Sequence, residues 1–373
     1  KYSGFFMENV NAVFGLEVEV KKLPLPIGIS FYTFQSISYL VDIYRRVCPP
    51  QKSLIKMGLF ISFFPQLIAG PILKYYDIAA QIDNRKVSLP LFNQGAVRFL
   101  QGLAKKIIIA NIMAKTADEI FALGINDIST PMAWIGIVAY TFQIYFDFSG
   151  YSDMAIGLGK MFGFHINENF NYPYIATSIK DFWRRWHISL STWFKEYLYI
   201  PLGGNREGKF KTYRNLMIVF FMTGLWHGAS WNFVVWGLFH GVFLVLERML
   251  PIEKFLRFRL IQNIYALLVV MVGWVFFRAE NLTAALDYLK RMFVPYKTDV
   301  YSAYLSNEFM MVAALGLVSC GFLTLIFDKL PVKTEYKFGF LRLVNPAWCA
   351  VIAYFSVLLL ASNTYNPFIY FRF

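Results

Sequence analysis

The sequence has few cysteines and lacks several familiar catalytic motifs, and each absence excludes a class of protein. Its three cysteines, Cys48, Cys320 and Cys349, are isolated and form no CxxC pair. They provide neither an even disulfide framework nor the ligand spacing of a zinc site. The GxSxG elbow of hydrolases and the phosphate-binding P-loop do not occur either. We therefore expect no metal site, no disulfide scaffold and no nucleotide-hydrolysing centre.

Charged residues are also scarce, at 16% of the 373 residues, whereas 57% are hydrophobic and the mean hydropathy is +0.46. Soluble domains contain about 45–50% apolar residues, so the composition predicts an integral membrane protein. The net charge of +13 could indicate a nucleic-acid-binding protein. However, the basic residues cluster in short segments between apolar runs, which is typical of cytoplasmic loops that face anionic lipid. We expect membrane lipid as a partner and no nucleic acid.

The apolar runs predict an all-α bundle of about eight to ten membrane spans, because a span needs roughly 20 mostly apolar residues. The candidate runs are 27–44, 54–73, 91–123, 132–159, 215–225, 229–250, 261–277, 309–327 and 347–361. Some are too short to cross alone and are expected to be re-entrant. No linker divides the chain, so we predict a single domain over residues 1–373. The chain begins at Lys1 without an initiator Met, and we expect its first spans to be missing.

Ionisable residues are concentrated in the central stretch 145–240, where they would be costly at membrane depth and therefore indicate function. They are Asp147, Asp153, Asp181, Arg184, Arg185, His187 and His227. If residues 178–199 form one helix, side chains three and four apart share a face. One polar stripe then contains Lys180, Arg184, His187, Ser191 and Lys195. From periodicity alone, an interfacial helix with a passive His187 is the favoured interpretation.

His227 stands between Trp226 and Gly228 at a predicted helix break in apolar surroundings. Histidine titrates near neutral pH, so it is a candidate general base. The alternative is a histidine whose ring bonds to a nearby carbonyl group, and the sequence leaves both open. His187 lies 40 positions earlier, so only the fold can bring the two together. We expect His240 to be structural and to pack against Trp236.

Several long blocks resemble the bacterial membrane-bound O-acyltransferases. They are FFPQLIAGPI, FDFSGYSDMAIGLGKMFGF, NFNYPY, DFWRRWHISLSTWFKEYLYIPLGG and GLWHGASWNFVVWGLFHG. The resemblance implies a ring of helices, partly re-entrant, around a tunnel through the bacterial cytoplasmic membrane. It also implies that His227 is the catalytic histidine of the family and His187 its second polar position.

The resemblance further implies acyl transfer, most simply of acetyl, from a cytoplasmic thioester to an extracytoplasmic polysaccharide. Acetyl-coenzyme A or an acyl-carrier protein would be the donor, and a partner acetyltransferase of the SGNH type could receive the group. Residues expected to line the site or bind substrate are Arg184, Arg185, Asp181, Trp183, Trp226, Ser191 and Asp147. The tryptophans would exclude water, and an arginine would offset charge on the carbonyl oxygen or bind lipid phosphate. D-alanyl transfer to teichoic acid and glycan or lipid transport remain alternatives.

The chain ends in Phe-Ile-Tyr370-Phe-Arg-Phe, which resembles a C-terminal hexapeptide of this family or of its partner peptides. A tyrosine there could accept the acyl group and pass it on, since a phenol is a better nucleophile precursor than an alcohol at neutral pH. The alternative is an aromatic anchor at the membrane interface.

Two further expectations concern charged residues outside the catalytic proposal. Asp147 and Asp153 lie six positions apart in an apolar run. We expect at least one of them, most plausibly Asp147, to pair with a basic group or a tyrosine inside the bundle. We also expect the basic segment 203–214 to be cytoplasmic.

Overall fold

The structure is a computed structural model that describes residues 2–19, 26, 28–250, 255–297, 301–323 and 346–362, and in these residues it is helical without a strand. The all-α class predicted from composition is thereby confirmed. The α-helices are α1 (Ser3–Phe14), α2 (Ile29–Tyr44), α3 (Leu54–Ile61), α4 (Tyr75–Asn84), α5 (Leu89–Ala104), α6 (Asn111–Phe121), α7 (Thr130–Met161), α8 (Ile179–Arg185), α9 (Ile188–Phe194), α10 (Lys209–His227), α11 (Trp231–Met249), α13 (Arg259–Arg278), α14 (Leu282–Phe293), α15 (Asn307–Ser319) and α18 (Pro346–Ser362). Shorter elements are the π-helices η1 (Lys105–Ala110) and η3 (Lys195–Tyr199) and the 3-10 helices η2 (Pro173–Ile175) and η4 (Tyr301–Tyr304).

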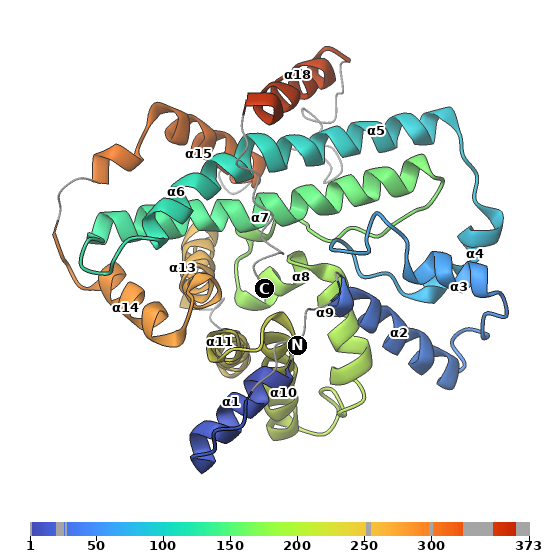
Figure 1. Cartoon of the computed structure of the whole chain (residues 1–373), viewed down its shortest axis with the longest axis horizontal. Helices are drawn as coiled ribbons and strands as arrows, with labels where there is room; N and C mark the ends of the chain where they lie inside the picture. Colours follow the sequence, from blue (N-terminus) through green and yellow to red (C-terminus); the bar gives the residue numbers. More distant parts are fainter. Residues whose placement is uncertain are drawn as a thin grey trace.

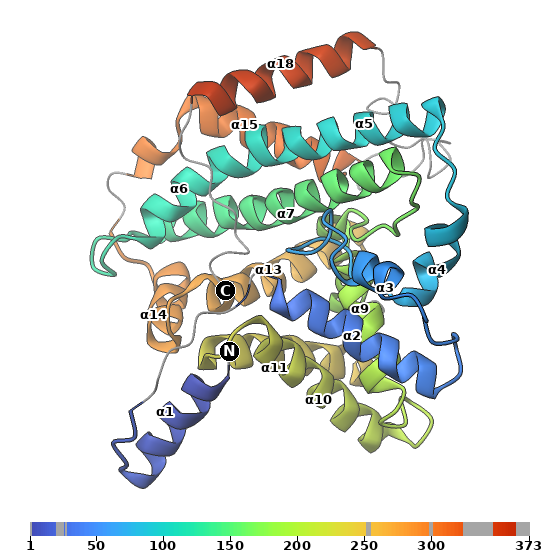
Figure 2. The ribbon, with the colours of Figure 1, turned by 45° about the vertical axis from the view of Figure 1, so that its right-hand side comes forward.

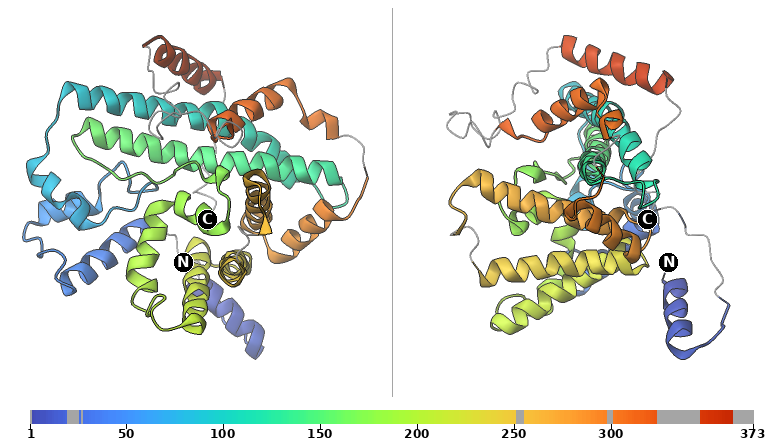
Figure 3. Two further views of the ribbon diagram at one scale, coloured as in Figure 1. Left: turned by 180° about the vertical axis from the view of Figure 1, so that it is seen from behind. Right: turned by 90° about the vertical axis from the view of Figure 1, so that its left-hand side faces the viewer.

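Helix α7 is the long central element, and α5 runs beside it (Figure 1). On one side of this pair lie α15 and α18, and on the other lie α13, α11 and α10, as the two turned views also show (Figures 2 and 3). The short helices α8 and α9 sit between α7 and the α10–α11 pair. Helices α2, α3 and α4 stand at one end and α14 at the other, so the segment 171–199 is surrounded by packed helices.

Helices α5 and α7 approach closely because glycines face glycines. A Cβ atom added to Gly95 would lie 2.5 Å from the carbonyl oxygen of Gly157, and one on Gly102 would lie 2.5 Å from that of Gly150. Small residues in register are the usual device for close helix contact in membrane proteins. Any side chain at these positions would force the two helices apart.

Carboxylates of α7 pair with basic groups of the helices beside it. Asp147 lies 2.7 Å from Lys106 Nζ, while Asp153 lies 2.6 Å from Arg98 and 2.7 Å from Lys105. Asp147 is 1% exposed, so its charge is compensated inside the bundle. The expectation that Asp147 pairs with a basic group there is confirmed.

Two of the described helices, Trp231–Met249 and Arg259–Arg278, are both long and apolar enough to cross a membrane. The structure therefore supports two of the predicted eight to ten membrane spans. Helix α7 is longer than either but carries polar and charged residues that face its neighbours. Its beginning follows the sequence, because Ser129 accepts the N–H of Met132 and a proline occupies the first turn.

The single helix predicted over residues 178–199 is wrong. Helix α8 ends at Arg185, Trp186 is extended, and His187 has φ 43° and ψ 56° before α9 begins. The predicted polar stripe therefore does not form, and His187 is 1% exposed inside the bundle. The basic segment 203–214 contains a loop followed by the first residues of α10, which begins at Lys209.

Candidate active site

The break between α8 and α9 is stabilised by Asn169, which lies in the loop after α7. Its backbone carbonyl accepts the N–H of Ile188 at 2.9 Å, and its side-chain oxygen accepts the N–H of Ser189 at 3.1 Å. These N–H groups belong to the first turn of α9 and have no partner within that helix. Asn169 therefore binds the N–H groups that an N-cap residue usually binds, although it is remote from α9 in sequence. These bonds offset the energetic cost of the left-handed backbone conformation of His187.

The His187 imidazole is oriented by the same amide. Its Nδ1 lies 3.2 Å from Asn169 Oδ1, and no residue in the described part of the chain bonds to its Nε2. Phe148 of α7 packs edge-on against the ring at 4.7 Å between centroids. Burial of the ring disfavours its charged form.

Asn169 connects three segments around this histidine. Besides the bonds above, its Oδ1 accepts Ser189 Oγ at 2.9 Å and its Nδ2 donates to Ser152 Oγ of α7 at 3.3 Å. Ser189 Oγ in turn accepts the backbone N–H of Ile72 at 2.9 Å. Asn169 itself is 0% exposed, so this arrangement is part of the packed interior.

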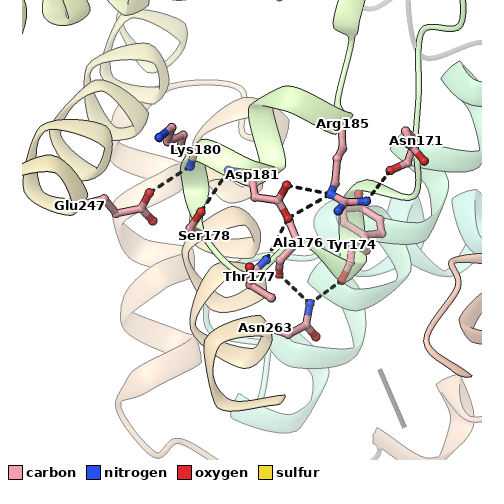
Figure 4. A network of polar contacts seen from close by, with 10 residues as sticks. All are labelled: Asn171, Tyr174, Ala176, Thr177, Ser178, Lys180, Asp181, Arg185, Glu247 and Asn263. Atoms are coloured by element: carbon pink, nitrogen blue, oxygen red, sulfur yellow. Dashed lines mark hydrogen bonds and ion pairs between the residues drawn. The ribbon is translucent and has the colours of Figure 1, made fainter. Parts of the chain in front are cut away.

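The start of α8 is held by residues of α11 and α13 (Figure 4). The Glu247 carboxylate accepts the N–H groups of residues 179 and 180, at 2.6 Å and 3.0 Å. The Asn263 side-chain amide donates to the carbonyl groups of Tyr174 and Ala176, at 2.8 Å and 2.9 Å. The segment that leads to His187 is therefore fastened to two helices that are remote in sequence.

Asp181 and Arg185 belong to this supporting network. Arg185 Nε donates to both carboxylate oxygens of Asp181 at 3.0 Å, and its guanidinium reaches the Asn171 carbonyl group at 3.3 Å (Figure 4). These bonds stiffen α8 and the loop before it. Arg184, one position earlier, is exposed.

Trp226 joins the two predicted histidines. Its ring centroid lies 6.4 Å from that of His187 and 4.7 Å from that of His227. The imidazoles are therefore no farther apart than these two distances added together. Trp226 also stacks on Phe34 of α2 at 5.2 Å, and Phe34 stacks on Trp193 at 4.0 Å. This aromatic column forms one wall of the region.

His227 is the last residue of α10 and is half-buried. Its ring contacts Trp236 of α11 and Phe277 of α13, each at 5.0 Å between centroids. The predicted helix break after His227 is present, because the following residue, Gly228, is extended. His227 and His187 thus converge on the same aromatic cluster from helices that are separate in sequence.

The other predicted site residues divide between this cluster and its surroundings. Trp183 is buried against Trp236 and His240, and Ser191 is half-buried on α9. Asp147 lies in the ion pair with Lys106. His240 packs against Trp236 at 5.3 Å, as predicted. Tyr370 lies outside the described residues.

Asn169 is not among the site residues predicted from the sequence, although the NFNYPY block begins with it. Its contribution is a set of bonds to residues 17 to 20 positions away, which no local pattern reveals. Among the described residues, no group of three His, Cys, Asp or Glu side chains is arranged to hold a metal ion. The arrangement offers two imidazoles among packed aromatic side chains, which suits proton transfer to or from a hydroxyl group.

Comparison with known proteins gives consistent matches. The model of the MBOAT, membrane-bound O-acyltransferase family, matches residues 49–283. A Pseudomonas putida protein named probable alginate O-acetylase AlgI is 43% identical, over 100% of this chain and 81% of its own length. The peptidoglycan O-acetyltransferase of Helicobacter pylori is 42% identical, over 78% of this chain and 61% of its own length.

A more distant relative is the teichoic acid D-alanyltransferase of Streptococcus thermophilus, which is 30% identical over 59% of this chain and 56% of its own length. The chain therefore spans most of the Pseudomonas putida protein but less than two thirds of the other two relatives. His187 and His227 both fall within the range that the family model matches.

Proposed function

Because this chain belongs to the membrane-bound O-acyltransferase family, we propose that it moves an acetyl group from a thioester donor to hydroxyl groups of an extracytoplasmic polysaccharide. Membership confirms the predicted class, an O-acyltransferase. The names of two relatives, an alginate O-acetylase and a peptidoglycan O-acetyltransferase, support acetyl as the group and a glycan as the acceptor.

The observation that carries the assignment of the site is the contact of Trp226 with both histidines. His227 is the general base: it takes the proton of the acceptor hydroxyl as the oxygen attacks the thioester carbonyl carbon. A C–O bond forms and the C–S bond breaks. The leaving thiolate receives the proton from the His227 imidazolium, so that atoms and charge balance. His187 accepts a hydrogen bond through Nε2 and orients the acceptor.

The aromatic surroundings limit hydrolysis of the donor. Trp226 and Trp183 are both buried, and excluding water from a thioester site prevents its loss to water. The two arginines are less suited to stabilise charge on the carbonyl oxygen, since Arg184 is exposed and Arg185 is engaged by Asp181. Arg184 is better suited to bind lipid phosphate.

The donor is acetyl-coenzyme A or an acyl-carrier protein that approaches from the cytoplasm, and the acceptor enters from the other side through a tunnel lined by the histidines. This arrangement requires a multi-pass protein of the bacterial cytoplasmic membrane. The bacterial relatives and the family are consistent with a membrane location. A partner acetyltransferase of the SGNH type would receive the acetyl group if transfer to the glycan is indirect.

Tyr370 is the proposed relay in that indirect route. Its phenolic oxygen would take the acetyl group from the thioester and pass it to the glycan hydroxyl or to the partner. Mass spectrometry of the C-terminal peptide after incubation with donor tests this step. An acetyl adduct on Tyr370 that is lost in Tyr370→Phe supports it, while full glycan acetylation by Tyr370→Phe leaves only an aromatic anchor.

D-alanyl transfer to teichoic acid is the alternative within the same chemistry, supported by the Streptococcus thermophilus relative at lower identity. Glycan or lipid transport is the alternative of another class. Protein reconstituted in vesicles and incubated with radiolabelled acetyl-coenzyme A or a D-alanyl thioester, and with alginate, peptidoglycan fragments or teichoic acid, distinguishes the three. Label in the fragments supports acetylation. D-alanyl transfer alone, or passage of the glycan with no new ester, overturns it.

A further inference from the structure

The side chain of Asn169 is placed to select one tautomer of a histidine in the proposed site. Its Oδ1 receives the backbone N–H of Ser189 at 3.1 Å, and a backbone N–H is always a donor. The amide is therefore oriented with its oxygen toward this group and its nitrogen toward Ser152. His187 Nδ1 lies 3.2 Å from that same oxygen and 3.5 Å from Ser189 Oγ, whose own proton goes to Oδ1. Because the shorter contact is with an oxygen that can only accept, the geometry favours a proton on Nδ1.

A neutral imidazole with its proton on Nδ1 has a lone pair on Nε2. Nε2 is buried and has no hydrogen-bond partner in the part of the chain that the structure describes. An unmade hydrogen bond in a buried ring is unfavourable and calls for an explanation, such as a ligand group that completes it. The ring also contacts Trp226, which contacts His227.

We propose that Asn169 is a positioning residue that holds His187 in the Nδ1–H tautomer, so that Nε2 accepts a hydrogen bond from a second hydroxyl group of the acetyl acceptor, next to the one whose proton His227 takes. This inference rests on the proposed function, since it names how the acceptor is recognised at that site. The acceptor therefore carries a hydrogen-bond donor next to its reacting oxygen, as the neighbouring hydroxyl groups of a sugar provide. In the opposite tautomer, Nε2–H would instead donate to the hydroxyl oxygen, which reverses the direction of the bond and turns the hydroxyl proton away from His187.

The test compares Asn169→Ala and Asn169→Asp with matched changes at Asn171. Asn171 lies two positions away in the same loop and is exposed, and only its backbone groups make the bonds to Arg185. Each protein is purified, and acetyl transfer from radiolabelled acetyl-coenzyme A to alginate or peptidoglycan fragments is measured against acceptor concentration and pH.

For Asn169→Ala we expect kcat/KM for the acceptor to fall about 10–100-fold, the usual effect of losing a residue that orients a histidine. Asn171→Ala should match the wild type. For Asn169→Asp the new carboxylate raises the pKa of His187. The protonated ring, which cannot accept a bond at Nε2, then persists to higher pH. The acid limb of the pH–rate profile should therefore move to higher pH, whereas Asn171→Asp should leave it in place.

A wild-type rate and pH profile in both Asn169 variants would overturn the proposal. If Asn169→Ala does not fold, Asn169→Asp decides, because it is isosteric and keeps an oxygen at Oδ1. A second measurement does not depend on turnover. ¹⁵N-histidine NMR of the wild-type protein, which has four histidines, reports the tautomer of His187 once its signals are assigned with His187→Gln.

An unprotonated Nε2 in the NMR measurement supports the proposal, and a protonated Nε2 overturns it. The proposed function and the positioning role of Asn169 can be contradicted independently of each other. Wild-type protein that acetylates no acceptor contradicts the proposed function, while the NMR result still decides the tautomer. Active wild-type protein with unchanged Asn169 variants contradicts the positioning role alone.

Discussion

Two polar regions of this molecule differ in whether their buried groups are charged. Between α5 and α7 the charges are matched, with Asp147 paired to Lys106 and Asp153 to Arg98 and Lys105. In the aromatic cluster around His187 and His240 the buried polar side chains are neutral, and several lack a bond. In the described residues, no partner is found for His187 Nε2, for the indole nitrogens of Trp183 and Trp236, or for either ring nitrogen of His240.

We interpret the ion-paired groups as stabilising the fold and the buried polar atoms without a partner as available to bind a substrate. Each buried polar atom left without a hydrogen bond costs about 1–3 kcal/mol, so a native structure retains such atoms where a water molecule or a ligand completes them. The charged pairs in turn gain little beyond compensating their own desolvation. We therefore propose that the ion pairs between α5 and α7 support the fold and that the aromatic cluster around His187 and His227 carries the catalysis, and the following changes test that division.

The largest effect is expected for His227→Ala, which should lower acetyl transfer by about 10²–10⁴-fold, the contribution of a general base. Its half-buried position at the end of α10 should leave folding intact. Radiolabel transfer measures the rate, and circular dichroism with gel filtration checks the fold. Full activity in this variant would favour transport over acyl transfer.

Asp147→Asn should act on folding and leave the chemistry unchanged. Lys106 would be left without its carboxylate inside the bundle, and breaking a buried pair costs about 3–5 kcal/mol. The yield of folded protein should fall while the rate per folded molecule stays near that of the wild type. The double change Lys106→Met with Asp147→Leu should recover part of the yield. A stable but inactive Asp147→Asn protein would instead place this residue in the active site.

His187→Ala should reduce transfer by about 10–100-fold, which is less than the loss in His227→Ala. A residue that orients the substrate contributes less to the rate than a general base does. The loss should appear mainly as a higher KM for the acceptor. Steady-state rates against acceptor concentration provide the measurement. If His187→Ala proves the more severe change, the roles of the two histidines are reversed.

Gly273→Ala should have the smallest effect and report on packing around His240. A Cβ atom there would lie 2.7 Å from His240 Nε2, and overpacking of this kind costs about 1–3 kcal/mol. Thermal unfolding should show a lower Tm, and in a His240→Ala background the same substitution should lower the Tm less, because the ring it would meet is gone. An unchanged Tm would mean that the imidazole moves aside at no cost.

Several features of this protein follow from the sequence alone. Its hydropathy sets the all-α class, and the apolar run 132–159 becomes α7 within two residues at each end because Ser129 and Pro131 set where the helix starts. The ordered motif blocks are sufficient to identify the family, which the family model and the relatives confirm. Predictions of this kind succeed because helix boundaries and hydropathy depend on residues that are neighbours in sequence.

Only the tertiary structure decided the break at His187 and the burial of its ring. Periodicity reports on residues three and four apart, and by that measure residues 178–199 resemble one amphipathic helix. The bonds that favour the break come from Asn169, 18 positions away from His187, and they satisfy N–H groups that a continuous helix would have paired internally. Similarly, Trp226 brings His187 and His227 together only because α10 packs beside the α8–α9 turn. Such contacts depend on how distant segments meet in the folded bundle.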